Sequence, residues 1–187
     1  MGECKMKKYL IGMVAVAGII LLMMCWYKES HRVRIPRCRE VKTITWEKLD
    51  TFVLSNPTFK VVYPNNFEVD SSQLKTGYIC FTHIIGGLEV SLRSFSSPND
   101  GRWNTEVAAD SAVYYRINLT NDSVTQRDMH DGYFYLSGFS KVMNYRFYEQ
   151  YVVDEDNIYV LELLYAKGIP EEKLERLKNL VHDWNPK

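Results

Sequence analysis

The sequence of 187 residues lacks most of the patterns by which enzymes and metal proteins are recognised. Its four cysteines form no CxxC pair, which argues against a zinc site or a thioredoxin-type redox motif. A glycine-rich phosphate loop, a GxSxG nucleophile elbow and internal repeats are also missing from it. We therefore assign no catalytic residue and no cofactor. Cys38 and Cys80 lie in the polar part of the chain, where a disulfide between them is one option.

Net charge is also lacking, because the 23 basic and 23 acidic residues balance. The two signs are unevenly distributed, since residues 1–42 hold nine basic and three acidic residues. Residues 43–187 are left with 14 basic and 20 acidic residues, a net charge of −6. Nucleic-acid binding needs clustered lysine and arginine, so no nucleic-acid partner is expected for this acidic part. The basic residues near the N-terminus instead fit a position beside lipid head groups.

One long segment is free of charge and proline, and it organises the rest of the chain. Tyr9–Tyr27 would form a helix of about 28 Å, close to the roughly 30 Å of a bilayer core. We predict a single-pass transmembrane or signal-anchor helix here, after a tail at 1–8 and before a basic stalk at 28–42. Two alternatives are a lipoprotein signal that starts at Met6 and ends at Cys25, and a buried helix of a soluble protein.

The side of the membrane on which the soluble part lies stays open. The basic stalk would place that part in the cytoplasm by the positive-inside rule. The signal-like start at Met6 favours the extracytoplasmic side, and we lean toward it.

Residues 43–187 are predicted to form one soluble α+β domain, an antiparallel sheet flanked by helices. β-Branched and aromatic runs between turn signals predict strands at 51–54, 58–63, 78–85, 88–95, 123–130, 132–139, 144–154 and 158–166. Gly86-Gly87 predicts a tight hairpin. The last strand is apolar on both faces except for Glu162, which predicts a central position. After the turn at 64–66, Phe67 and Val69 are expected to re-enter the core.

Two helices are predicted from apolar residues that recur at helical spacing. The first covers 104–119, capped by Asn104 or Thr105, and the second begins at Pro170. The expected buried stripes are Ala108, Ala112, Tyr115 and Leu119 in the first helix, and Leu174, Leu177, Val181 and Trp184 in the second.

The order of these elements, together with Phe59–Pro64 (FKVVYP), Phe67 and the closing Trp184, resembles the Mog1/PsbP-like superfamily with its DcrB-like members. The resemblance covers roughly Phe52 to Trp184. It implies an antiparallel sheet between helices, and a binding or assembly factor rather than an enzyme. The photosystem-associated branch supports a metal cluster and the Mog1 branch binds a small GTPase, but the functional residues of neither branch map onto this sequence.

Two groups of residues are candidate sites. Asp128 and His130 would share one face of a strand, as a weak candidate for a metal or acid–base site, although no third ligand stands at suitable spacing. A strand end that runs into the next turn explains them equally well. Tyr133, Tyr135 and Tyr148 would form a partner surface if they face solvent, because tyrosine is enriched at binding hot spots. The alternative for these tyrosines is cross-strand packing within the sheet.

We expect a membrane-tethered, non-enzymatic binding or assembly domain with a protein partner of unknown identity. The alternative is a small-ligand carrier or enzyme that uses the groove between the sheet and its helices. That alternative predicts a deep pocket with convergent polar groups.

Overall fold

The computed structural model describes residues 43–187. The predicted tail, transmembrane helix and stalk, together with Cys38, lie outside the described residues. Within residues 43–187, no helix is both long and apolar enough to span a bilayer. Cys80 forms no disulfide with another residue of this described part, and its pairing with Cys38 stays an option.

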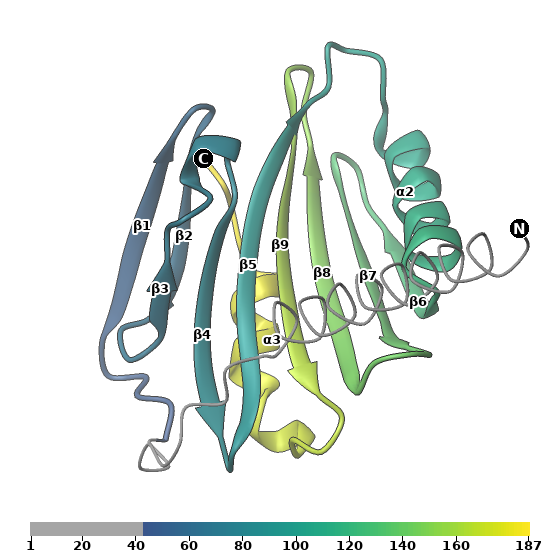
Figure 1. Cartoon of the computed structure of the whole chain (residues 1–187). Coiled ribbons are helices and arrows are strands. Elements are labelled where there is room, and N and C mark those ends of the chain that lie inside the picture. The colour runs from purple at the N-terminus through teal and green to yellow at the C-terminus, as the bar shows by residue number, and fades with distance from the viewer. Residues whose placement is uncertain (1–42) are drawn as a thin grey trace, which may run out of the picture. The chain divides into compact units, whose positions relative to one another are not determined.

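The centre of the domain is a seven-stranded antiparallel sheet with the strand order β3-β4-β5-β9-β8-β7-β6 (Figure 1). Its strands are β3 (Glu68–Asp70), β4 (Ile79–Ile85), β5 (Leu88–Pro98), β6 (Asp122–Met129), β7 (Tyr133–Ser140), β8 (Tyr145–Val153) and β9 (Asn157–Ala166). β9 is the middle strand of the seven, as its two apolar faces predicted. The β4–β5 hairpin is also confirmed, with Gly86 and Gly87 at φ values of 58° and 81°.

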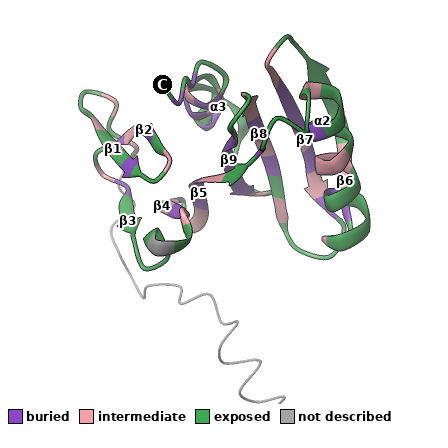
Figure 2. Ribbon diagram, turned by 90° about the horizontal axis from the view of Figure 1, so that it is seen from above, coloured by how far each residue is buried: buried purple, intermediate pink, exposed green. Residues whose placement is uncertain are grey.

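One face of the sheet is covered by the C-terminal helix and a separate hairpin (Figure 2). The helix is α3 (Glu175–His182), preceded by the short turn η3 (Glu171–Lys173), and the hairpin pairs β1 (Leu49–Ser55) with β2 (Thr58–Pro64). The predicted stripe on this helix is confirmed, since all four of its residues are buried. Trp184 closes the layer, because its indole N–H donates to the Lys60 carbonyl over 2.8 Å.

The opposite face carries α2 (Thr105–Tyr114), followed by a single π-helical turn, η2 (Tyr115–Leu119). Asn104 caps α2, accepting a hydrogen bond from the Val107 N–H over 2.9 Å. The fully buried residues of α2 are only Ala108 and Ala109, which pack over β7 and its neighbours. The helix therefore offers little apolar surface to the sheet.

Part of the predicted stripe on this first helix is wrong. Ala108 is buried and Ala112 partly so, but Tyr115 is 53% exposed and Leu119 68% exposed. The buried side of the helix is set by Ala108, Ala109 and Ala112, and Arg116 continues it four residues after Ala112, which leaves Tyr115 at its margin. The π-helical turn, which begins at Tyr115, then moves Leu119 off this side. Val69 is also not a core residue, because β3 is an edge strand and its side chain is 41% exposed, whereas Phe67 is buried.

Gly138 in β7 is the point where the sheet leaves least room for a side chain. A Cβ atom there would lie 2.0 Å from the Ser123 carbonyl oxygen and 2.7 Å from the Phe147 ring. We expect Gly138→Ala to lower the free energy of unfolding by about 3 kcal/mol or more, because β6 and β7 must separate. Urea unfolding followed by tryptophan fluorescence measures this loss.

Gly87→Ala is the matched control, since no atom lies within 4 Å of its Cβ position and only the positive φ of 81° is strained. That strain should lower stability by about 1–2 kcal/mol. Equal stability of the two variants would contradict the close contact at Gly138.

Candidate functional site

All five candidate residues from the sequence lie in one region, at the end of the sheet where α3 terminates. Its core is a set of rings that we call the aromatic–histidine cluster, made of His130, Tyr133, Tyr135, Tyr148 and His182. Strand alternation places the two β7 tyrosines and Tyr148 of β8 on the same face of the sheet. His130 follows β6, and His182 is the last residue of α3.

The rings of the cluster form one continuous stack. His130 lies on Tyr133 with a centroid distance of 4.6 Å, and Tyr133 meets Tyr135 edge-on at 5.7 Å. Tyr135 then stacks on His182 at 4.5 Å and on Tyr148 at 6.0 Å. Such pairs contribute about 0.5–1.5 kcal/mol each beyond burial, so the five rings hold one another in place.

Hydrogen bonds fasten the end of α3 to this stack. The Tyr135 hydroxyl donates to the His182 carbonyl over 2.8 Å, and the Tyr148 hydroxyl lies 3.2 Å from His182 Nδ1. Burial raises the pKa of Tyr135 to about 12 and also raises the pKa of Tyr148. Both phenols therefore stay protonated at neutral pH, and each keeps a proton to donate.

The tyrosines differ in their access to solvent. A partner surface was expected only where these tyrosines face solvent. Tyr135 is only 5% exposed, so it does not meet this condition. Tyr133 and Tyr148 are half-buried, while His130 and His182 are exposed. The accessible part of the cluster is thus made of the two histidines and the two half-buried tyrosines around the buried Tyr135.

Gln150 lies behind the buried centre and was not found from the sequence. Its amide Nε2 is 3.5 Å from the Tyr135 hydroxyl, and its side chain is buried. Its Oε1 atom has no hydrogen-bond partner among residues 43–187. Only the strand register identifies this residue, because Gln150 stands directly opposite Tyr135 on the neighbouring strand.

Asp128 and His130 share a face, as predicted. His130 Nε2 lies 3.4 Å from Asp128 Oδ2, and the His130 N–H donates to the Tyr133 carbonyl over 3.0 Å. No group of three histidine, cysteine or acidic side chains within residues 43–187 is arranged to hold a metal ion. The pair closes the turn at Gly132, where φ is 79°, and this geometry fits the strand-end interpretation.

The opposite face of the sheet contains a buried ion cluster that we did not predict. Arg116 of η2 donates from Nη1 to Asp122 over 3.1 Å and from Nε to Glu149 over 3.3 Å, and its Nη2 contacts both Glu149 and Glu162. Its guanidinium also stands 4.2 Å over the Phe147 ring. The four charged side chains are at most 8% exposed.

Three carboxyl groups around one guanidinium leave an excess of negative charge. The next cation, Arg93, is 3.9 Å from Glu162. Burial raises the pKa of Glu149 to about 7, with Arg116 opposing the rise and the charge of Glu162 adding to it. The same carboxylates raise the pKa of Arg116, so it remains a cation. Glu149 is therefore the group that takes up a proton near neutral pH.

An open depression of about 390 Å³ lies at the start of α2. Its lining includes Asn104, Arg127 and His130. It is not the groove between α3 and the sheet, where Leu177 and Val181 are fully buried against the core.

The arrangement of strands and helices is similar to a solved structure, that of cyanobacterial PsbP (CyanoP) from Synechocystis sp. PCC 6803. The TM-score is 0.53 over 78% of this chain and 94% of that chain, with 13% sequence identity. The fold is PsbP-like. This confirms the resemblance inferred from the element order, and at this identity it concerns the fold alone. No family model matches the sequence, and no curated protein matches it.

The raised pKa of Glu149 makes stability depend on pH. Between about pH 4.5 and 7 the folded protein keeps the Glu149 proton and the unfolded chain does not, so stability from this group falls as pH rises through that window. We expect the fall to be on the order of 1–3 kcal/mol. Glu149→Gln should remove it, so that the variant gains stability relative to the wild type from pH 5 to pH 8.

Urea unfolding of the full-length protein in detergent at several pH values measures this difference. Glu155→Gln, at an exposed turn between β8 and β9, is the control and should leave the profile unchanged. Parallel profiles for Glu149→Gln and the wild type would show that Glu149 does not titrate in this range.

Proposed function

We propose that this chain is a membrane-tethered, non-enzymatic domain that binds a protein partner through the aromatic–histidine cluster. The tether is the uncharged segment Tyr9–Tyr27, by its length and composition. The binding role is inferred from the continuous ring contacts of this cluster, four of whose five rings are exposed or half-buried.

Several properties of the stack support binding to a protein. Tyrosine and histidine rings offer large contact area with few rotatable bonds, and tyrosine is enriched at binding hot spots. The hydrogen bonds from Tyr135 and Tyr148 to His182 fix the rings before any partner arrives, which reduces the entropy lost on binding. Asp128 and Asp183 add negative charge beside the rings, so the partner surface is expected to carry basic groups.

The alternative of a ligand carrier or enzyme in the sheet–helix groove has less support. A ligand site of that kind is concave and buries most of its ligand. Here α3 lies directly on the sheet, with Leu174, Leu177 and Val181 at 0% exposure.

Photo-cross-linking from within the stack tests the proposal. Benzoylphenylalanine replaces Tyr133 in the full-length protein, and cells are irradiated before membranes are sedimented. We expect a reproducible cross-linked protein at this position, because Tyr133 is only half-buried and lies in the proposed contact. The same replacement at Tyr114, a 62% exposed tyrosine on α2, is the matched control and should give no such product.

Equal cross-linking at the two positions would argue against a specific partner surface. Recovery of the intact full-length protein in the high-speed supernatant without detergent would refute the tether, whatever the cross-links show.

A further inference from the structure

Exposed apolar side chains gather at one corner of the domain. Thirteen large hydrophobic residues of the described chain are strongly exposed, and seven of them lie on α2, on η2 or in the loop between β7 and β8. We call four of these seven residues, two from η2 and two from the loop, the apolar corner: Tyr115, Leu119, Val142 and Met143. Scattered exposed apolar residues are ordinary, but a contiguous group marks a contact surface.

The sheet register brings these two segments together. Asp122, the first residue of β6, pairs with Ser140, the last residue of β7. Leu119 lies three residues before Asp122 and Val142 two residues after Ser140, so the two segments lie at the same corner. The Ser140 hydroxyl accepts hydrogen bonds from the Val142 and Met143 N–H groups, over 3.3 and 3.0 Å. The loop is thus held in shape while these two side chains stay 73% and 63% exposed.

The first described residues of the chain lie at the same end of the sheet. The Thr43 carbonyl accepts a hydrogen bond from the Asn66 side chain over 2.9 Å, and the Asn66 carbonyl lies 3.3 Å from His83 near the end of β4. The loop between β7 and β8 is at this end too, since the Lys167 N–H, just after β9, donates to the Asn144 carbonyl. Figure 1 shows both at the lower end of the sheet, at opposite edges.

We propose that the apolar corner rests on the lipid surface to which the chain is tethered. The proposal depends on the tether of the proposed function, because the 42 residues before Thr43 include the uncharged segment Tyr9–Tyr27. Tyr115 would lie at the head-group level, where tyrosine rings are favoured, and Leu119, Val142 and Met143 would reach the acyl boundary. With the corner on the bilayer, the aromatic–histidine cluster at the far end of β7 would face away from it.

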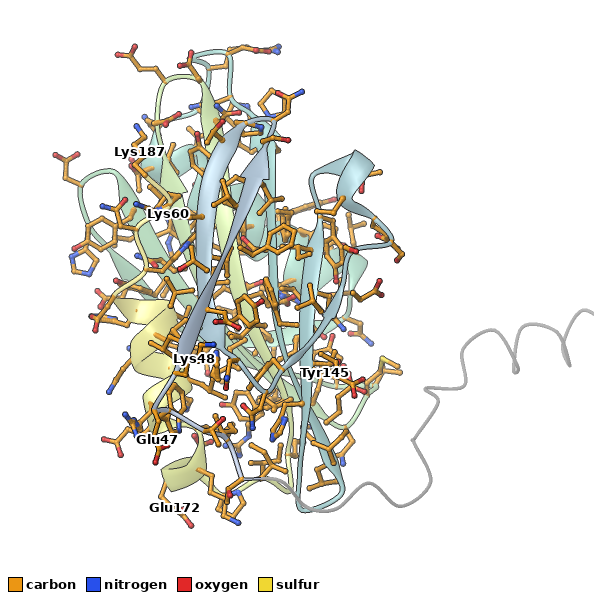
Figure 3. The ribbon with its side chains drawn as sticks, turned by 90° about the vertical axis from the view of Figure 1, so that its left-hand side faces the viewer. Glu47, Lys48, Lys60, Tyr145, Glu172 and Lys187 are labelled. Carbon is orange, nitrogen blue, oxygen red and sulfur yellow. The ribbon has the colours of Figure 1, made fainter. Side chains whose placement is uncertain are left out.

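Size and charge favour lipid over a second copy of the chain. Four side chains at a projecting corner expose a few hundred Å², below the roughly 800 Å² that each partner of a stable protein complex buries. Lys141 and Lys167 flank the corner and suit anionic head groups. The acids at this end are Glu47, Glu89, Glu171 and Glu172, of which Glu171 is paired with Arg146 and Lys178 (Figure 3).

Lipid quenching of a fluorescent label tests the contact. The full-length protein, with its four cysteines replaced by serine, receives Val142→Cys and a bimane label. It is reconstituted in vesicles of phosphatidylcholine and phosphatidylglycerol that carry a shallow doxyl-labelled lipid. Val53→Cys is the matched control, because Val53 is also an exposed valine, at 61%, but lies toward the opposite end of the domain in β1.

We expect quenching at position 142 to exceed that at position 53 on the order of twofold or more. Weak and equal quenching in protein that sediments with the vesicles would overturn the lipid contact and leave the tether intact. Cross-linking of two Val142→Cys copies by a bis-maleimide, without quenching, would assign the corner to a second copy and overturn the proposal. Protein that stays out of the vesicles would overturn both the tether and the contact.

Discussion

The position of α2 and η2 on one face of the sheet depends on a single buried guanidinium, that of Arg116. Arg116 joins η2 to three strands at once, through Asp122 on β6, Glu149 on β8 and Glu162 on β9. The helix that precedes it buries only two alanines fully, so apolar packing alone does not fix its position. Buried ion groups of this kind add little net stability over a well-packed apolar core, but the loss of one partner leaves a charge without compensation. The cluster thus specifies where the helix lies more than how stable the domain is.

The inward position of Arg116 determines what its neighbours do. Arg116 lies four residues after Ala112 and continues the inward side of the helix, so Tyr115 lies at the margin of that side. The π-helical turn moves Leu119 off it, and both residues belong to the apolar corner. On the other face, the hydrogen bond from Tyr135 to the end of α3 organises the aromatic–histidine cluster. The two proposed surfaces therefore lie on opposite faces and at opposite ends of β7, so the domain can contact lipid and a partner protein simultaneously.

The sequence predicted those parts of the fold that depend on turn residues or on the spacing of apolar residues within one element. The glycine pair, the two-sided apolar strand β9 and the stripe of α3 were all found because each depends on neighbours within a few positions. Tyr115 was misplaced because the expected stripe left out the side that Ala109 and Arg116 share, and Leu119 because a 3.6-residue spacing does not anticipate a change of pitch. The ion cluster was missed because its members are brought together only by strand register, although Glu162 was visible as the one charge in β9. For the same reason the sequence identified Tyr133, Tyr135 and Tyr148 as a group but not Gln150 or His182 beside them.

The most direct test of this account is the free energy of unfolding of Arg116→Met, measured by urea in detergent beside the triple variant Arg116→Met, Glu149→Leu, Glu162→Leu. If the guanidinium compensates buried carboxylates, the single variant loses about 3–5 kcal/mol. The triple variant, which replaces most of the cluster by apolar groups, should recover a large part of that loss. A single variant within about 1 kcal/mol of the wild type, or a triple variant that is no more stable than the single one, would contradict the account.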